Sequence, residues 1–480
     1  YVNGNVVGQH KGAFAAFCFD VTKYIRFGEK NLLAVKVTNA KDPTLPPLQG
    51  DFTVFGGLYR SVHLLILEQT SFSPLDFASS GVYVMQTQVC KDSASMAITT
   101  KLRNTSGMEK EFTIRSSLID REGKGVIRQD SKLNVKANSD SQATFRLSLR
   151  SPHLWNGIKD PYLYTAKVEL FVDNKLVDQL NEKIGLRYFA IDATKGFFLN
   201  GEPYRLYGVN RHQDRENMGW AIGAKEHRED FQLIREMGCN AVRLAHYQHA
   251  NEFYDLCDNG GVVVWAELAL VDDVGTSQEF IDNCKSQLTE LIKQNYNHPA
   301  IFFWSLFNEL IPDGRQEIFT DYIKKLNELA KQLDPSRLTA AASRSKYDGS
   351  VGINRVSDVI GYNVYKGWYE GLPEGFATYI DSMHSRFPEL KIAVTEYGAG
   401  GGIHQHEYPA QKHDTKGKWH PEEWQALVHE VIWKAISSRD YLWGSFLWNM
   451  FDFASDRRTE GEQNGINDKG LVTFDRTVKK

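Results

Sequence analysis

The sequence contains few cysteines, and they form no pattern that indicates a structural or redox site. There are five, an odd number, without Cys-x-x-Cys spacing, so neither a disulfide framework nor a zinc cluster is predicted. The compartment of the protein therefore does not follow from its cysteines. They are Cys18, Cys90, Cys239, Cys257 and Cys284.

Long apolar runs and blocks of basic residues are also absent. No stretch approaches the roughly 18 apolar residues of a transmembrane helix, so no membrane partner is predicted. The net charge of −4 and the lack of a Lys/Arg block argue against nucleic acid as a partner. A signal-like segment is missing too, and the chain opens at Tyr1 in mid-pattern, so we expect a fragment or a processed product.

What the sequence has in quantity is length and aromatic residues. Its 480 residues exceed one ordinary domain, so two or three domains are expected. A hydrophobic content of 42% with 24% charged residues is typical of a globular protein. The 10 Trp, 21 Tyr and 27 Phe serve mostly as core, but such a supply also suits sugar-binding clefts, where rings stack on pyranose faces.

The first 187 residues are rich in β-patterns. Residues 1–71 contain short strand-like segments, too few for a closed sandwich, so we expect earlier strands to be missing. Residues 72–187 show the spacing and alternation of an immunoglobulin-like β-sandwich. The predicted strands are 1–7, 13–19, 31–37 and 60–66, then 81–88, 95–102, 111–119, 142–148 and 163–171.

From residue 188 to residue 480, predicted strands alternate with amphipathic helices. Regular alternation indicates a parallel sheet with helical crossovers, and eight such units close into a (β/α)8 TIM barrel. A last helix would be expected after Val478. The predicted strands are 204–210, 239–245, 261–266, 300–307, 338–342, 358–364, 391–396 and 442–449, and the helices are 227–237, 250–258, 278–296, 316–333, 375–386 and 422–438.

Two apolar strands of the predicted barrel end in glutamates. The run 300–309 is apolar at nearly every position, as expected for a strand buried on both faces, and ends in Asn308 and Glu309. The tract 391–397 repeats the pattern with Glu396. Barrel enzymes present catalytic groups at the C-terminal ends of their strands. Alternatively, Glu309 caps the following helix or pairs with an arginine.

The other strand ends are polar as well, which a purely structural barrel would not need at one rim. Two carboxyls with histidine, asparagine and aromatic neighbours fit a retaining glycosidase, which needs an acid/base and a nucleophile roughly 5 Å apart. Asn308 would hydrogen-bond the sugar 2-hydroxyl, and Tyr365 would orient the nucleophile. The polar ends are Asn210-Arg211-His212, Arg243, His246, Glu267, Asn363, Tyr365 and Trp448-Asn449, with Asp452 beyond.

Several tracts together resemble family 2 of the glycoside hydrolases, in the order of that family and over nearly the whole chain. The resemblance implies that residues 1–71 are part of a jelly-roll sugar-binding domain, followed by the immunoglobulin-like sandwich and the catalytic barrel. The tracts are Asp51–Arg60, Leu154-Trp155, Pro161–Tyr164, Gly208–His212, Ala241–Tyr247, Asn297–Pro299 with Trp304–Glu309, and Thr395–Gly398.

The resemblance also implies a role for each matched residue. Glu309 would be the acid/base and Glu396 the nucleophile, whereas the role of Asp51, in a distant domain, depends wholly on the resemblance. The alternatives are that Trp448 is a residue of the barrel core and that His212 and His246 are core histidines with satisfied hydrogen bonds. The implied substrate-binding residues are Asp51, His212, His246, Asn308, Asn363, Tyr365, Trp448, Asn467 and Lys469.

No metal ion or other cofactor is predicted. Some members of the family bind magnesium through a Glu and a His shortly after the third strand, but the equivalent residues 267–272 contain no His. After the nucleophile, residues 398–402 are nearly all glycine. We expect a flexible loop there that widens the cleft or repositions His404 or His406.

Two sugars compete for the predicted pocket. Asn467-x-Lys469 resembles the pattern that holds the substrate carboxylate in β-glucuronidases, and the tract 363–369 also resembles a tract of those enzymes. Residues 465–472 and 396–400 resemble tracts of bacterial β-galactosidases. We predict an exo-acting enzyme for terminal β-D-galactose, with a β-glucuronidase as the alternative. Lys469 would otherwise be a solvated lysine or a partner of the neighbouring aspartate.

The sequence also allows predictions about whether the protein is an enzyme, what it binds and where it is located. The alternative to an enzyme is a protein that binds carbohydrate without catalysing a reaction. The expected partner is the end of an oligosaccharide or polysaccharide. The resemblance implies that jelly-roll and sandwich surfaces can serve as contacts of a homo-oligomer, and a periplasmic or secreted location would suit a bacterial glycan degrader.

Overall fold

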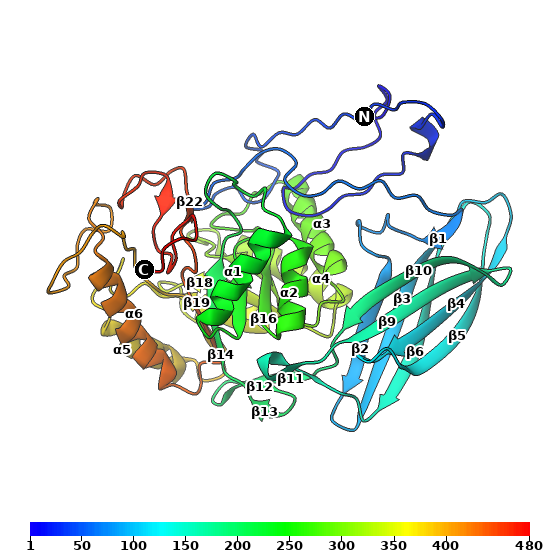
Figure 1. The fold of residues 1–480 in the computed structure, drawn as a ribbon. Helices are drawn as coiled ribbons and strands as arrows, with labels where there is room; N and C mark the ends of the chain where they lie inside the picture. The colour runs from blue at the N-terminus through cyan, green and yellow to red at the C-terminus, as the bar shows by residue number, and fades with distance from the viewer.

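The computed structural model describes residues 1–480 and contains a closed barrel beside a β-sandwich, with an N-terminal segment over both (Figure 1). All eight barrel strands are parallel and follow one another in sequence order, so the predicted TIM barrel is confirmed. The barrel strands are β14 (Leu206–Arg211), β15 (Ala241–Leu244), β16 (Val263–Glu267), β17 (Ile301–Asn308), β18 (Leu338–Arg344), β19 (Val359–Asn363), β20 (Ile392–Glu396) and β21 (Gly444–Leu447).

Helices surround the barrel (Figure 1). Each of them is amphipathic and has buried apolar residues on one face. Between β18 and β19 the crossover contains only the 3-10 turn η3 (Gly352–Arg355), as the short irregular link in the sequence predicts. None of the helices is both long and apolar enough to cross a membrane. The helices are α1 (Ala224–Glu236), α2 (Asn251–Gly260), α3 (Gln278–Gln294), α4 (Gln316–Leu333), α5 (Gly375–Arg386) and α6 (Glu422–Ser437).

The barrel is closed below by a small sheet and is filled by aromatic side chains. Every residue of β17 is buried, as its unbroken apolar run predicts. Phe197 of the closing sheet packs 5.8 Å from Phe302 of β17, ring centre to ring centre. With this end plugged, the polar strand ends lie at the other rim. The closing strands are β11 (Phe189–Asp192), β12 (Gly196–Leu199) and β13 (Glu202–Pro203).

The sandwich contains two four-stranded sheets, β1-β3-β2 with β6 and β10-β9-β4-β5. The three-residue strand β1 was absent from the sequence prediction, and so were two longer strands, β5 and β10. Both lie at sheet edges and expose mostly polar side chains, so the apolar alternation that marks a half-buried strand is weak in them. The strands are β1 (Thr70–Phe72), β2 (Val82–Val89), β3 (Ser93–Asn104), β4 (Lys110–Ile119), β5 (Gly125–Val135), β6 (Ser139–Arg150), β9 (Tyr164–Val172) and β10 (Lys175–Ile184).

Residues 1–68 form no paired strand, so the four strands predicted there are wrong for this structure. Only isolated bridges join Val2 to Asn5 and to Leu33. An alternating pattern favours an extended segment, but a strand also needs a partner to satisfy its backbone groups. Between these segments only residues 1–3 and 32–34 exchange backbone hydrogen bonds, which is too little for a strand. Many apolar side chains of residues 1–68 are accordingly exposed, including Phe27 at 83% and Ile66 at 89%, although Val2 and Phe14 are buried.

The N-terminal segment is nevertheless fastened to the polar rim of the barrel. It crosses the end of the barrel that also carries the C-terminal loops (Figure 1). The Thr53 amide donates to the Ala454 carbonyl, and the Arg60 guanidinium donates to the Gln248 carbonyl. The short elements of the connections are η1 (Thr22–Tyr24), β7 (Trp155–Asn156), η2 (Gly157–Lys159), β8 (Asp160–Pro161), β22 (Phe453–Ala454) and β23 (Ile466–Asn467).

Candidate active site

Glu309 stands immediately after β17 and is held by contacts to both of its carboxyl oxygens. Asn363 Nδ2 donates to Oε1 at 2.9 Å, and Arg344 Nη2 lies 3.3 Å from Oε2. The backbone φ of Glu309 is +56°, a left-handed conformation uncommon outside glycine, and its amide donates to the Ala342 carbonyl. Burial and the nearby charge of Glu396 raise the pKa of Glu309 to about 7. Glu309 can therefore carry a proton near neutral pH.

Glu396 is the last residue of β20 and accepts hydrogen bonds at both oxygens. Arg243 Nη1 donates to Oε1 at 2.7 Å, and the Tyr365 hydroxyl donates to Oε2 at 2.7 Å. The same guanidinium donates to Asn308 Oδ1 at 2.8 Å and to Glu267. Arg243 is fully buried, and it fixes the orientation of Glu396 relative to the Asn308 amide.

Asn363, a predicted substrate-binding residue, is buried, and both its amide nitrogen and its amide oxygen already form hydrogen bonds within the protein. Its nitrogen donates to Glu309, and its oxygen accepts from the Thr395 hydroxyl at 2.7 Å. The structure therefore places Asn363 as a brace between the ends of β17 and β20.

Both predicted histidines lie at the rim, next to Trp448. His246 stacks on the Trp448 indole at 5.0 Å, and its Nδ1 lies 2.9 Å from Glu267 Oε2. His212 stands edge-on to Trp448, and its Nδ1 pairs with the Tyr247 hydroxyl at 3.0 Å. Burial holds the pKa of His212 well below its usual value, so the ring is neutral. Its buried Nε2 has no partner in the protein and could bond a sugar hydroxyl.

Asp51 reaches the same rim from the N-terminal segment. Its carboxylate accepts hydrogen bonds from Asn467 Nδ2 at 3.0 Å, from Arg458 Nε at 2.9 Å and from the Ser455 hydroxyl at 2.6 Å. Burial by itself would raise the pKa of Asp51, but Arg458 and Lys469 bring it below its usual value. No sequence pattern points to Arg458, because its partner lies 407 residues away along the chain.

Lys469 is the predicted cation of the pocket, and its ammonium group has no hydrogen-bond partner. The residue is 1% exposed, and Nζ lies 5.3 Å from the ring centre of Trp368 and 5.2 Å from that of Tyr369. The alternatives of a solvated lysine or a partner of Asp468 do not fit, since that carboxylate bonds His420 instead. A buried ammonium without a partner is costly, so this position is suited to an anion.

The glycine-rich loop differs from the flexible loop that the sequence predicts. A Cβ at Gly400 would lie 2.5 Å from Asp468 Oδ1, and one at Gly401 would lie 2.7 Å from Gln425 Oε1. These glycines therefore allow close packing beneath the Asn467–Lys469 turn. His404 and His406 are exposed and pair with Glu462 and Glu423 outside the rim.

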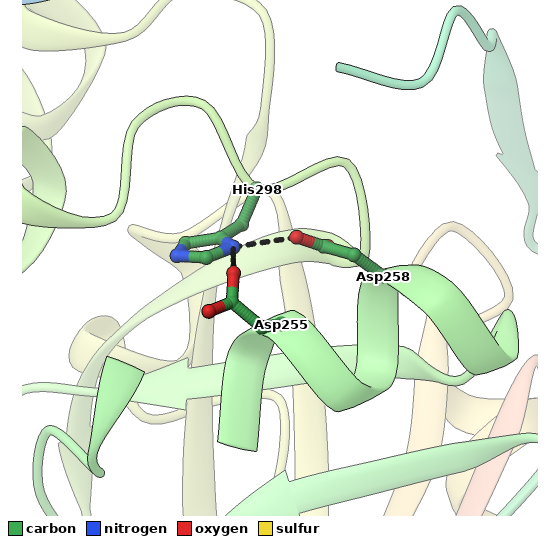
Figure 2. Close-up of side chains that lie close together, drawn as sticks. All are labelled: Asp255, Asp258 and His298. Atoms are coloured by element: carbon green, nitrogen blue, oxygen red, sulfur yellow. Dashed lines mark hydrogen bonds and ion pairs between the residues drawn. The ribbon is translucent and has the colours of Figure 1, made fainter. Parts of the chain in front are cut away.

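One group of acidic and histidine side chains outside the rim lies close enough to hold a metal ion (Figure 2). His298 Nδ1 lies 2.5 Å from Asp258 Oδ2 and 3.9 Å from Asp255 Oδ1, and Nε2 lies 3.0 Å from Asn251 Oδ1. Both ring nitrogens face oxygen acceptors, which fits a protonated imidazolium better than a metal ligand. Asp258 also accepts from the Ala300 amide, so the cluster braces the turn before β17.

This ion pair should stabilise the fold in a pH-dependent way. Burial by itself would lower the pKa of His298, but Asp258 raises it above its usual value. The stabilisation is then complete below the unfolded pKa of about 6.5 and is lost as the pH rises through the folded pKa. Asp258→Asn should cost about 3–5 kcal/mol at pH 6 and less at pH 9.

Differential scanning calorimetry across this pH range checks the prediction. Asp255→Asn is the matched control, because that carboxylate is half exposed and more distant from the ring. Equal losses for the two variants, or a loss that grows with pH, would contradict the assignment.

Nearly the whole chain matches models of one enzyme family. Residues 1–68 match the sugar binding domain of glycosyl hydrolases family 2, residues 82–187 match the family 2 central domain, and residues 190–480 match the family 2 TIM barrel domain. The chain belongs to family 2 of the glycosyl hydrolases. The predicted family and its three-part architecture are thereby confirmed.

Individual members of family 2 resemble the chain over at least 95% of its length. A β-glucuronidase of Bacteroides fragilis is 43% identical over 488 residues, which cover 100% of this chain and 69% of that protein. A β-galactosidase of Bacteroides ovatus is 26% identical over 514 residues, which cover 95% of this chain and 57% of that protein. The solved structure of β-glucuronidase 2 of Bacteroides uniformis, covalently bound to cyclophellitol-6-carboxylate aziridine, superposes with a TM-score of 0.94 at 30% identity, over 99% of this chain and 58% of that one.

These similarities favour the alternative sugar over the predicted one. Relatives named for both activities match the chain, but the β-glucuronidase of Bacteroides fragilis is much more similar than the β-galactosidase of Bacteroides ovatus. The predicted preference for galactose is therefore not confirmed, whereas membership of a β-glycosidase family is.

Proposed function

We propose that this family 2 chain is the catalytic part of a retaining, exo-acting β-glucuronidase. Glu396 is the nucleophile and Glu309 is the acid/base. The two carboxyls differ as this mechanism requires: Glu309 keeps its proton near neutral pH, whereas Glu396 accepts two hydrogen bonds and is held ready to attack.

The reaction runs in two displacements. Glu396 attacks C1 of the sugar while Glu309 gives its proton to the glycosidic oxygen, so the aglycone leaves and a glycosyl ester forms on Glu396. Glu309, now ionised, takes a proton from water, and the oxygen of that water attacks C1. The ester bond to Glu396 breaks and the free sugar leaves with retained configuration.

The observation that carries the choice of sugar is the buried, unpartnered ammonium of Lys469. A uronate carboxylate would supply the anion that this position lacks, beside the rings of Trp368 and Tyr369 that flank the ammonium group. Asn467, two residues earlier, would donate to the same carboxylate. The similarity to the Bacteroides uniformis β-glucuronidase 2, which was solved covalently bound to cyclophellitol-6-carboxylate aziridine, supports this proposal.

Hydrolysis of a matched pair of substrates tests the proposal. We expect kcat/KM for 4-nitrophenyl β-D-glucuronide to exceed that for 4-nitrophenyl β-D-galactoside by at least the roughly tenfold that about 1.4 kcal/mol represents. The galactoside is the control, since it differs at C6 and in the configuration at C4. Faster hydrolysis of the galactoside would instead support the β-galactosidase prediction, and no hydrolysis of either would support a silent binding protein.

A further inference from the structure

The acid/base candidate Glu309 shares one guanidinium with a second carboxylate. Arg344 is the last residue of β18, and its Nη2 lies 3.3 Å from Glu309 Oε2 and 2.6 Å from Asp272 Oδ1. Arg344 Nε also donates to the Glu309 carbonyl at 3.2 Å. One positive charge is thus divided between two negative groups, neither of which is fully exposed.

Backbone hydrogen bonds hold this arrangement in place. The Asp272 amide donates to the Asn308 carbonyl at 3.0 Å, and the Ile311 amide donates to the Asp272 carbonyl at 3.0 Å. The loop after β16 is therefore fastened to the end of β17 on both sides of Glu309. Asp272 has a φ of +61°, and this turn presents its carboxylate to Arg344.

Other charged or titratable groups around Glu309 act on it without involving this pair. Glu396 faces it from β20 and Tyr365 from the segment after β19, while Arg243 on β15 is engaged by Glu396. Asn363 donates one neutral hydrogen bond. Arg344 is therefore the cation in direct contact with Glu309, and Asp272 is the group that competes for it.

The charges have opposite effects on the proton of Glu309. Burial and Glu396 raise its pKa, Arg344 lowers it, and Asp272 raises it again. With Arg344 bonded to Glu309 alone, a close ion pair would form and the acid would be ionised before it could protonate the leaving group. Without any cation, the base of the second step would hold its proton too tightly.

We propose that Arg344 and Asp272 are positioning residues that set the proton affinity of Glu309, with Asp272 withholding part of the Arg344 charge so that Glu309 alternates between acid and base near neutral pH. This inference rests on the proposed role of Glu309 as acid/base. It assigns to the loop after β16 a role in the chemistry at the end of β17.

The test is the pH profile of kcat/KM for 4-nitrophenyl β-D-glucuronide, whose alkaline limb reports loss of the essential proton from the free enzyme. Asp272→Asn should move this limb down by about one pH unit, and Arg344→Met should move it up by about one. Arg344→Lys keeps the charge and should lie between wild type and Arg344→Met. Opposite shifts are not expected from a merely structural pair, which would lower activity at every pH.

A neighbouring ion pair provides the matched control. Arg315 Nη2 donates to Asp273 Oδ1 at 2.8 Å in the same loop region, and no contact joins either residue to Glu309. Asp273→Asn and Arg315→Met should leave the alkaline limb where it is. Thermal melting of every variant identifies any that fails to fold, and the remaining variants of the pair then carry the comparison.

Two outcomes separate this inference from the proposed function. If Glu309→Gln keeps wild-type rates and the same alkaline limb, the proposed acid/base role itself is wrong. If Glu309→Gln removes the limb but Asp272→Asn and Arg344→Met leave it unshifted, or move it in the same direction, then the charge-sharing inference alone is overturned.

Discussion

Replacing Glu396 with glutamine is expected to reduce kcat on 4-nitrophenyl β-D-glucuronide by a factor on the order of 10⁴ or more. An amide has nearly the shape of the carboxylate and can still contact Arg243 and Tyr365, but it cannot form the glycosyl ester of the first step. The large loss should therefore come from chemistry and not from unfolding.

A mechanism-based label makes this result specific. A 2-deoxy-2-fluoro glucuronosyl fluoride should add one sugar to the peptide that contains Glu396, as detected by mass spectrometry, and should add none in Glu396→Gln. Glu370→Gln is the control, because that carboxylate bonds Lys366 and Ser345 away from the site and should keep most of the activity. A label on another residue, or full activity of Glu396→Gln, would refute the assignment.

Replacing Lys469 with methionine is expected to lower kcat/KM for the glucuronide by about 10²- to 10³-fold while leaving the galactoside rate nearly unchanged. The loss corresponds to roughly 3–4 kcal/mol, the cost of leaving a buried carboxylate without its charged partner. Methionine can fill the same space against Trp368 and Tyr369, so packing of the pocket should be retained.

The ratio of the two rates is the measurement that matters, because a general disturbance of the rim would lower both. Lys366→Met is the matched control: Lys366 lies in the segment of Tyr369 but is bonded to Glu370, and the glucuronide preference should survive its removal. Equal losses on both substrates in Lys469→Met would show that Lys469 supports the fold of the pocket and does not read the sugar.

The barrel was predictable because its signals are local. A strand buried on both faces has to be apolar along its whole length, so the run that becomes β17 is visible without any partner. The same run shows where polarity returns, at Asn308 and Glu309, and parallel strands bring all such ends to one rim. The edge strands β5 and β10 show the opposite case, because polar side chains at an edge leave no periodic trace.

Pairings across long stretches of sequence could not be predicted. The contact of Asp51 with Arg458 and the division of Arg344 between Glu309 and Asp272 depend on loops whose positions follow only from closure of the barrel. The glycines after Glu396 illustrate the same limit. Glycine permits both a mobile loop and very close packing, and only the approach of Asp468 to Gly400 decides for packing.

The sequence by itself determined the barrel, the family and the two carboxyls that we propose as catalytic, since each depends on residue types repeated along a strand or gathered in a short tract. Tertiary structure alone decided the state of those groups. Burial, the neighbouring Glu396 and the shared Arg344 bring the pKa of Glu309 to about 7, and the lack of a hydrogen-bond partner for Lys469 Nζ is the basis of the anion site that we propose. Charges act through space, and their distances exist only once the chain has folded.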